Sequence, residues 1–221
     1  MANATCTQRL KVCHLRVLRL DDDGTIFVGA ESRYEYGAPA TFSYTATSPD
    51  RERFEQIDGC GDQCALYIGP PKAVDSADLA LTTCNDDAEV TELLAGGAVI
   101  DTATGGGDTI GYLSSTDATV NVNGVAIEVW SYQWNGRQRA LRNGSPAFYR
   151  HTFPMTNWEV DQKTMENAMG TVSFTGIAQT NSGFATGYSA DPFPVSMGES
   201  VYGWFIDDAV PASACGYQAV A

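Results

Sequence analysis

The stretch Thr41-Phe42-Ser43-Tyr44-Thr45-Ala46 carries aromatic side chains at alternate positions and hydroxyl side chains between them. Successive side chains of a β-strand point to opposite faces of the sheet, so this alternation predicts a strand with one buried face. The stretch Thr171-Val172-Ser173-Phe174-Thr175 repeats the pattern and predicts a second strand of the same kind. The fold class that follows is mainly β.

Other apolar runs extend this prediction to a sheet of several strands. Short runs predict strands at 25–28, 65–68, 79–84 and 201–206. The run 125–130 is apolar on both faces except at Glu128, as expected of a central strand that is covered on both sides. The pairs Asp23-Gly24 and Asn123-Gly124 are hairpin-type turn signals, and 58–64 is interpreted as a further hairpin turn.

A single short helix is predicted after the strand at 79–84. Candidate caps precede an apolar stripe with helical spacing: Asn85, Asp86 or Asp87 for the cap, and Val90, Leu93 and Leu94 for the stripe. Glu89 and Glu92 suit the positive N-terminal end of a helix, and Gly96-Gly97 end it. One helix in an otherwise antiparallel β chain predicts an antiparallel β-sandwich with one flanking α-helix.

The chain of 221 residues is expected to form a single domain over 1–221. Hydrophobic residues make up 43% of it, which is enough for a core and excludes wholesale disorder. We expect an N-terminal arm over about residues 1–14 and a Pro/Gly-rich C-terminal tail over about 182–221 that docks elsewhere. The N-terminus has no secretory apolar region, and no apolar run reaches the ~18 residues of a membrane span, so a soluble protein made in the cytoplasm is expected.

The chain carries 13 Lys+Arg against 27 Asp+Glu, which gives a formal net charge of -14. A cationic nucleic-acid-binding surface is thereby excluded, because such surfaces are basic. Two interpretations of the acidic excess stay open. It can serve solubility, or it can form a surface that remains beside a polyanion without binding it.

The charges are segregated along the chain. The first twenty residues hold four bases and no acid: Arg9, Lys11, Arg16 and Arg19. Residues 73–136 hold no base and these acids: Asp75, Asp78, Asp86, Asp87, Glu89, Glu92, Asp101, Asp108, Asp117 and Glu128. Bases return at Arg137, Arg139 and Arg142, in a loop between Asn135-Gly136 and Asn143-Gly144, and at Arg150. Such segregation permits head-to-tail association of copies, and chance clustering on a solvated surface is the alternative.

Metal and cofactor signals are weak. Cys60 and Cys64 are separated by three residues and lack a second matching pair, whereas zinc ribbons use a two-residue gap twice. Ordinary thiols are expected in a reducing compartment, with a late disulfide as the minority alternative. His14 and His151 have no ligand neighbours at helical or hairpin spacing, and the glycine-rich 101–107 lacks the Lys-Ser/Thr ending of a phosphate loop. We therefore assign no metal and no cofactor.

Enzyme signatures are equally weak, and no catalytic residue is assigned. The chain has no Gly-x-Ser-x-Gly elbow and no His-Glu-x-x-His motif. The strongest enzyme alternative is a sandwich glycosidase in which Glu128 and either Glu159 or Asp161 form a carboxylate pair ~5 Å apart. Its sugar cleft would be lined by Trp130, Trp134, Trp158 and Trp204. These carboxylates lack a tight local motif, and tryptophans of sandwiches are more often core residues, so we expect the protein not to be an enzyme.

The order of several motifs resembles a known family. The motifs are Cys13-His14-Leu15-Arg16-Val17-Leu18-Arg19-Leu20-Asp21, Phe54-Glu55-Gln56-Ile57-Asp58-Gly59 with Cys64, Asp78-Leu79-Ala80-Leu81-Thr82-Thr83-Cys84, Glu89-Val90-Thr91-Glu92-Leu93-Leu94-Ala95-Gly96-Gly97, Thr109-Ile110-Gly111-Tyr112, Gly124-Val125-Ala126-Ile127-Glu128-Val129-Trp130-Ser131 and Met165-Glu166-Asn167-Ala168. Together they resemble the major tail tube proteins of long-tailed phages that infect actinobacteria. The resemblance spans about residues 5–181 and rests on the ordered set, since no single motif is specific.

The resemblance implies a structural virion protein without an active site. Its sandwich assembles into hexameric rings that stack head to tail into a hollow tube with a multi-chain inner β-barrel. The implied partners are further copies of the chain, a tape-measure protein, and the tail terminator and distal tail proteins. DNA passes through the lumen without specific binding, there is no membrane insertion, and assembly takes place in the host cytoplasm. The two termini and the loops 101–107 and 137–143 are the expected contacts between rings.

An acidic lumen agrees with this resemblance, because Lys and Arg contacts would bind the phosphates and stall sliding DNA. Glu128 is expected either to point into the lumen or to pair with an arginine at an interface between copies. The alternative functions are another virion sandwich, such as a capsid decoration or minor tail protein, and a carbohydrate-binding or hydrolytic sandwich.

Overall fold

The structure of the chain, a computed structural model, describes residues 8–37, 39–49, 53–57, 63–68, 73–102, 108–114, 123–135, 138–165, 170–184, 187–188, 192–193, 195–211 and 216–220, of which 8–11, 30, 53–57, 63–68, 135, 138 and 216–219 are described by their backbone only. The strands are β1 (Gln8–Arg19), β2 (Gly29–Tyr36), β3 (Pro39–Thr47), β4 (Arg53–Ile57), β5 (Gln63–Ile68), β6 (Ser76–Thr83), β7 (Ala98–Asp101), β8 (Thr109–Leu113), β9 (Val125–Asn135), β10 (Gln138–Arg139), β11 (Leu141–Arg142), β12 (Ser145–Pro146), β13 (Phe148–Thr164), β14 (Thr171–Gln179), β15 (Gly203–Asp207) and β16 (Gly216–Val220). The helix α1 (Ala88–Ala95) follows β6, and a 3-10 turn, Ser182–Phe184, follows β14.

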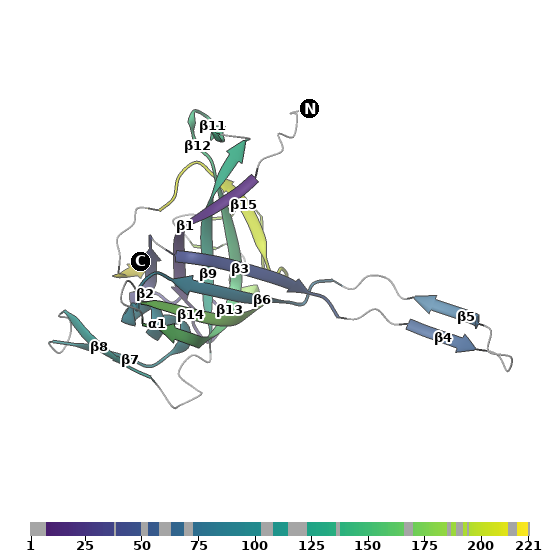
Figure 1. The fold of residues 1–221 in the computed structure, drawn as a ribbon, viewed down its shortest axis with the longest axis horizontal. Coiled ribbons are helices and arrows are strands. Elements are labelled where there is room, and N and C mark those ends of the chain that lie inside the picture. The colour runs from purple at the N-terminus through teal and green to yellow at the C-terminus, as the bar shows by residue number, and fades with distance from the viewer. Residues whose placement is uncertain are drawn as a thin grey trace.

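One antiparallel sheet organises the molecule, in the order β16-β2-β1-β9-β13-β14-β6-β3, with β10 beside β9 and β15 beside β13. The long strand β13 joins its two halves, because its first residues pair with β9 and β15 and its later residues pair with β14. A register shift between Phe153 and Thr156 marks a bulge, which bends the strand. The strands β3 and β6 cross in front of β1 and β9, so the sheet is folded into a sandwich-like, unclosed arrangement (Figure 1).

The main hydrophobic core lies between the two layers of this sandwich. The alternation of the two stretches that predict strands is confirmed there, because Phe42, Tyr44, Val172 and Phe174 all pack in the core. Their neighbours with hydroxyl side chains point to the other side of the sheet. The run 125–130 is confirmed as a central strand, since β9 pairs with β1 on one edge and with β13 on the other.

The predicted helix is confirmed as α1, and its cap is Asp87. The Oδ1 atom of Asp87 accepts hydrogen bonds from the backbone N–H of Glu89 at 3.0 Å and of Val90 at 3.3 Å. The helix ends at Gly96, where φ is 75° and a glycine is favoured. Its apolar stripe, made by Val90, Leu93 and Leu94, is buried in the main core. The helix therefore flanks the sandwich, as predicted.

Two of the predicted strand positions are wrong or displaced. Residues 25–28 form no strand, because only Ile26 makes an isolated bridge, to Leu20, across the predicted Asp23-Gly24 turn. The strand of this region is β2, which begins at Gly29 and pairs with β1. Residues 201–206 contribute β15, which begins at Gly203, and it is followed by the unpredicted edge strand β16.

The two expected arms are corrected where the structure describes them. Residues 8–14 belong to β1 and pair with β9 from Gln8 onward, so the expected N-terminal arm does not extend to residue 14. Much of the expected tail packs on its own chain. The side chains of Phe184, Tyr188, Phe193 and Met197 form a second core with β1 and β9, and β15 and β16 join the main sheet.

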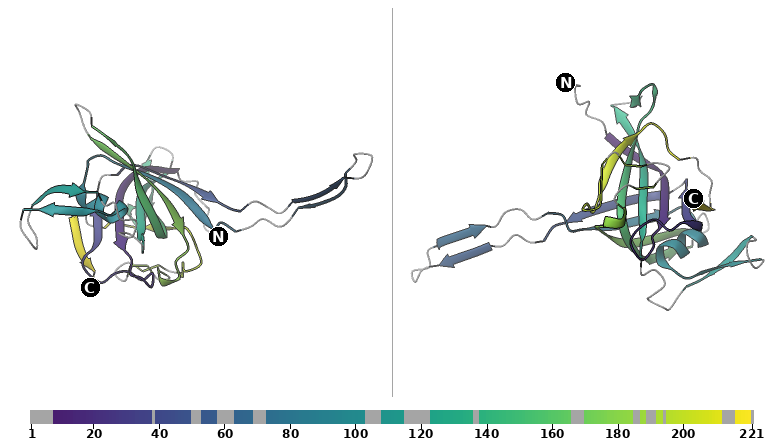
Figure 2. Two further views of the ribbon diagram at one scale, coloured as in Figure 1. Left: turned by 90° about the horizontal axis from the view of Figure 1, so that it is seen from below. Right: turned by 180° about the vertical axis from the view of Figure 1, so that it is seen from behind.

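Two hairpins project from opposite sides of this body (Figure 2). One is β4–β5, which continues outward from the end of β3 and β6, and it confirms the hairpin predicted around 58–64. The residues 58–62 at its tip, with Cys60, lie outside the described residues. The other hairpin is β7–β8, beside α1, and residues 103–107 of its loop also lie outside the described ones. In the described part of the chain, no helix is both long enough and apolar enough to span a bilayer.

Candidate functional site

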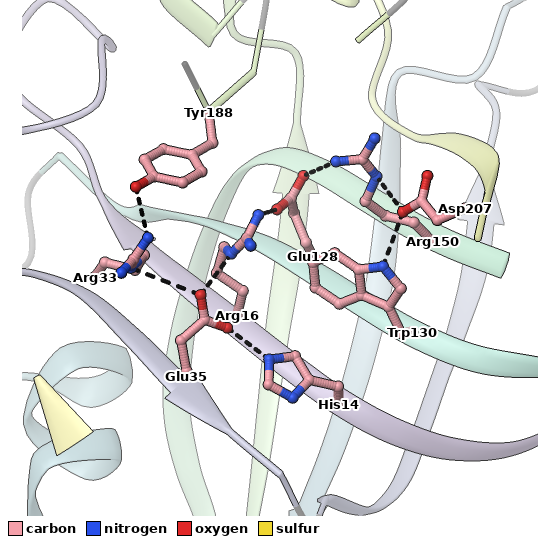
Figure 3. A network of polar contacts seen from close by, with 9 residues as sticks. All are labelled: His14, Arg16, Arg33, Glu35, Glu128, Trp130, Arg150, Tyr188 and Asp207. Atoms are coloured by element: carbon pink, nitrogen blue, oxygen red, sulfur yellow. Dashed lines mark hydrogen bonds and ion pairs between the residues drawn. The ribbon is translucent and has the colours of Figure 1, made fainter. Parts of the chain in front are cut away.

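A network of buried charges lies on the face of the sheet opposite the main core. Strand alternation explains its position. On β1, Leu15 and Val17 point into the main core, and His14 and Arg16 therefore point to the second face. The same alternation in β2 and β9 presents Glu35 and Glu128 there. Nine residues from five strands and one loop make the network (Figure 3): His14, Arg16, Arg33, Glu35, Glu128, Trp130, Arg150, Tyr188 and Asp207.

Glu128 is at the centre of this network and is fully buried, with 0% of its surface exposed. Its Oε2 accepts a 2.7 Å hydrogen bond from Nη1 of Arg16, and its Oε1 lies 3.5 Å from Nη1 of Arg150. The expectation that Glu128 points into a lumen or pairs at an interface is therefore wrong. Its partners belong to the same chain, because β1 and β13 flank β9 directly.

Glu35 forms the second carboxylate centre. Its Oε1 accepts a 2.8 Å hydrogen bond from Nε of Arg16 and lies 3.6 Å from Nε of Arg33. Its Oε2 lies 2.5 Å from Nε2 of His14. His14 is 1% exposed and packs edge-on against Trp130, so it is a buried packing residue of this part of the sheet.

Asp207 closes the network at β15. Its Oδ2 accepts a 2.9 Å hydrogen bond from Nε1 of Trp130 and lies 3.1 Å from Nε of Arg150. The segment after β14 then covers the network, because the ring of Tyr188 faces the guanidinium groups of Arg16 and Arg33, and Arg33 Nη1 donates a 2.5 Å hydrogen bond to its hydroxyl. Segments far apart in sequence are thereby held on one sheet face.

The charges of the network balance. Three guanidinium groups, those of Arg16, Arg33 and Arg150, face three carboxylates, those of Glu35, Glu128 and Asp207. Burial by itself lowers the pKa of Arg16, but the negative charges of Glu128 and Glu35 and their hydrogen bonds outweigh it and raise the pKa above its ordinary value. The raised pKa keeps the Arg16 guanidinium charged at any physiological pH, and the arrangement of the network suits the positioning of strands.

The fold does not bring together the carboxylates named for the glycosidase alternative. Glu128 pairs across the sheet with Thr152 of β13, and Glu159 lies seven residues farther along that strand, a separation of roughly 20 Å. Asp161 lies farther still, and both are exposed while Glu128 is buried. The tryptophans are dispersed: Trp130 lies in the network, Trp158 in the main core, Trp134 near the end of β9, and Trp204 on β15 beside Tyr149.

Other predicted site residues have identifiable surroundings. The ring of His151 lies between Ser131 and Tyr202, with Nδ1 3.1 Å from the Tyr202 hydroxyl. The Sγ atom of Cys13 donates a 3.4 Å hydrogen bond to the Trp130 carbonyl, and Cys84 is a free thiol. Among the described residues, the one cluster with metal-ligand spacing is Asp21, Asp22 and Asp23, in an exposed turn. Hydrogen bonds from Thr25 account for the lowered pKa of Asp23.

A second candidate surface is the outer face of the four strands β3, β6, β14 and the second half of β13. The residues of this outer face are mostly small hydroxyl residues with two carboxylates: Thr41, Ser43, Thr45, Asp78, Ala80, Thr82, Asn157, Glu159, Ser173, Thr175 and Ile177. A groove of about 530 Å³ crosses it between Asp78 and Glu159. No Lys or Arg belongs to this face among the described residues. Lys163 is the register partner of the core residue Val172, so its side chain points to the core side of the sheet, where it binds Asp86 beside α1.

The fold buries some of the charged residues that are segregated along the sequence and leaves others exposed. Arg16 and Arg150 are buried in the network and are not available for contacts between copies. Arg139 and Arg142 remain exposed, near the start of β13. Of the acids in 73–136, Asp78 lies on the outer face, Glu128 is buried, and Asp117 lies outside the described residues. No protein-family model matches the chain, and no curated protein matches it.

Proposed function

We propose that this chain is the tail tube protein of a long-tailed phage. Identical copies stand side by side in hexameric rings, and the rings stack into a hollow tube that conducts genomic DNA into the host. The observation that carries the proposal is the outer face of β3, β6, β14 and the second half of β13, a strand surface of hydroxyl and carboxylate side chains without a described base.

Such a surface suits the lining of a DNA conduit. Lys and Arg side chains would neutralise phosphates and release counterions, which creates affinity and slows sliding. Short hydroxyl side chains leave the face smooth, and the carboxylates of Asp78 and Glu159 repel the phosphates. The buried network contributes indirectly, because it neutralises Arg16 and Arg150 within the subunit and leaves the acidic excess unpaired elsewhere.

The edges of the same four strands support ring formation. β3 pairs only with β6 among the described strands, and the β9 partner of β13 ends at Thr156, which leaves residues 157–164 of β13 without a described strand on that edge. The four strands alternate in direction, so β3 of one copy would run antiparallel to residues 157–164 of its neighbour. Pairing of two different edges from copy to copy is a heterologous contact, and such contacts form a ring where the rotation between copies closes.

The projecting hairpins supply contacts between rings. The β4–β5 hairpin extends well beyond the body, and the β7–β8 hairpin extends from the opposite side (Figures 1 and 2). The loops 101–107 and 137–143 remain the other proposed contacts. Within the virion, the tube would surround a tape-measure protein and end at the tail terminator and distal tail proteins, after assembly in the host cytoplasm.

Electron microscopy of the purified protein, and of particles that contain it, tests this proposal. Rings or tubes with a central channel are expected. Discrete knobs on a capsid would instead assign the chain to capsid decoration, and a monomer that binds sugars would assign it to carbohydrate recognition. Either outcome overturns the tail-tube proposal.

A charge reversal on the outer face tests the proposed lining. Tubes built from the double variant Asp78→Lys/Glu159→Lys should assemble and eject DNA more slowly than wild type, because two cations per subunit would bind the phosphates. The matched control is Asp22→Lys, in the exposed turn away from the outer face. Equal ejection rates for the wild type and the double variant would show that this face does not line the lumen.

A further inference from the structure

The strands β3, β15 and β16 all lie at edges of the main sheet, and a charged side chain covers part of the β15 edge. We infer that Arg142 closes the β15 edge to strand addition and thereby removes it as an alternative to the pairing of β3 with residues 157–164 of a neighbouring copy. This inference rests on the proposed function, because it specifies which edge of the sheet is available for assembly. Arg142 is then a specificity-determining residue for self-association.

The closing contacts come from the β11–β12 hairpin. Nη1 of Arg142 donates a hydrogen bond to the backbone carbonyl of Ile206, the residue of β15 opposite Tyr149. Nε of Arg142 lies 3.6 Å from Oδ1 of Asp208, and Nδ2 of Asn143 donates to Oδ2 of Asp208 at 3.5 Å. A charged side chain thus lies across the end of the strand on its outer side.

The geometry of antiparallel pairing shows why this contact matters. Along an edge strand, the backbone N–H and C=O groups of alternate residues point toward the partner and away from it. The carbonyl of Ile206 accepts a hydrogen bond from the Arg142 side chain, so it lies on the side that an added strand would use. A strand from another copy could pair along β15 only after displacing the Arg142 guanidinium.

The hairpin that carries Arg142 is held firmly at its root. The backbone N–H of Ala140 donates to the Gln133 carbonyl at 2.8 Å, and the N–H of Ala147 donates to the Ala140 carbonyl at 2.9 Å. At its tip, Asn143 and Gly144 have positive φ values of 52° and 82°, as a two-residue hairpin turn requires. The backbone of the hairpin therefore fixes where Arg142 begins, beside β15.

The β3 edge differs, because β6 is its one partner among the described strands. Its nine residues contain no charge, and its register with β6 is regular from Thr41 to Thr47. Soluble proteins commonly blunt edge strands with charged side chains or bulges, because bare edges pair with other chains. A protein that covers the β15 edge and leaves the β3 edge bare has one edge fewer at which an extra copy could add and branch the ring.

The experiment compares Arg142→Ala with its matched control Arg139→Ala, which changes an exposed arginine of the same loop region whose guanidinium lies over Tyr132 of β9. Sedimentation and electron microscopy measure the fraction of protein in irregular or branched assemblies. We expect this fraction to rise roughly tenfold for Arg142→Ala, which corresponds to about 1.4 kcal/mol, and to stay unchanged for the control.

A suppressor variant separates this effect from simple misfolding. In Arg142→Ala/Ile206→Pro, the proline removes an outward N–H and obstructs strand addition, so regular assembly should return. Irregular assembly that persists in the double variant, or that appears equally in Arg139→Ala, would overturn the inference. If the wild type forms no rings or tubes at all, the proposed function fails, whereas the comparison of irregular association between the variants still tests the role of Arg142.

Discussion

Arg16 and Glu128 lie directly opposite each other on β1 and β9, and Nη1 of Arg16 donates a 2.7 Å hydrogen bond to Oε2 of Glu128. Both side chains are buried, at 4% and 0% exposure. Pairs of this kind often contribute little net stability, because desolvation of the two charges offsets their attraction. Their position suits another role. A slip of one residue between β1 and β9 would turn one of these two charges toward the main core and separate it from its partner, so the pair specifies the register.

Removal of one partner should be costly. We expect Glu128→Gln to lower the free energy of unfolding by about 3–5 kcal/mol, because Arg16 and Arg150 lose a buried counter-charge. Urea unfolding measures the loss, with the exposed Glu159→Gln as control, for which a change within about 0.5 kcal/mol is expected.

The double variant Arg16→Met/Glu128→Leu should lose much less stability than the sum of the losses of its two single variants. The double variant removes both charges of this pair, whereas each single variant leaves one charge without its partner. Glu35 keeps His14 and Arg33, and Arg150 keeps Asp207. Additive losses would contradict the coupling of Arg16 and Glu128.

Asp87→Ala should destabilise the protein by about 1–2 kcal/mol, since it removes the cap of α1. It also removes the acceptor of the hydrogen bond from the Tyr34 hydroxyl. Amide hydrogen exchange at Glu89 and Val90, whose N–H groups lose their acceptor, locates the effect. The neighbouring Asp86→Ala, which removes an exposed ion pair with Lys163, should cost under about 1 kcal/mol. Equal losses for both variants would argue against capping.

Gly176 lies against the indole of Trp158, and a Cβ atom at this position would approach Cδ2 of Trp158 to 2.6 Å and the Asn157 carbonyl oxygen to 2.8 Å. We therefore expect Gly176→Ala to cost about 1–3 kcal/mol and to change the tryptophan fluorescence, because the indole must move. The control Gly170→Ala meets its nearest atom, the Thr164 carbonyl oxygen, at 3.5 Å and should leave the fluorescence unchanged. An unperturbed spectrum for Gly176→Ala would rule out this close packing.

The pKa of Tyr112 is raised above its ordinary value of 10.0 by burial and by the nearby carboxylates of Glu92 and Asp86. The raised pKa favours the neutral phenol, which donates a 2.5 Å hydrogen bond to the Gly96 carbonyl. Its contribution to stability is thus present below pH 10 and is lost as the pH rises through the raised pKa. Phenolate absorbance, taken as the difference between wild type and Tyr112→Phe, should show that Glu92→Gln lowers this pKa while the distant Glu199→Gln does not. The same pKa in the wild type and in Glu92→Gln would contradict the electrostatic cause.

Local patterns were sufficient for the parts of the fold that have one buried face. The alternation in β3 and β14 and the stripe of α1 follow directly from the periods of strand and helix. The pattern did not reveal the first half of β13, because residues 148–154 are covered on both sides and do not alternate. β2 was missed although Arg33-Tyr34-Glu35-Tyr36 alternates, since its second face buries charges.

The network shows the same limit at the level of a site. Glu128 is conspicuous in the sequence as a lone carboxylate in an apolar strand, but its partner Arg16 lies 112 positions away. Two interpretations, exposure in a lumen and pairing at an interface, fit the local pattern equally well. Only the pairing of β9 with β1 and β13 places two guanidinium groups beside it.

The sequence by itself determined the mainly β character, the one capped helix and the acidic balance, because these depend on side-chain period and on composition. The tertiary structure alone decided which charges are buried and which are exposed. It placed Arg16 and Arg150 inside with Glu128, left Asp78 and Glu159 on an outer face without described bases, and placed Arg142 over the β15 edge. The physical reason is that strand pairing joins residues far apart in the chain, and whether a charge meets a counter-charge or water depends on that pairing.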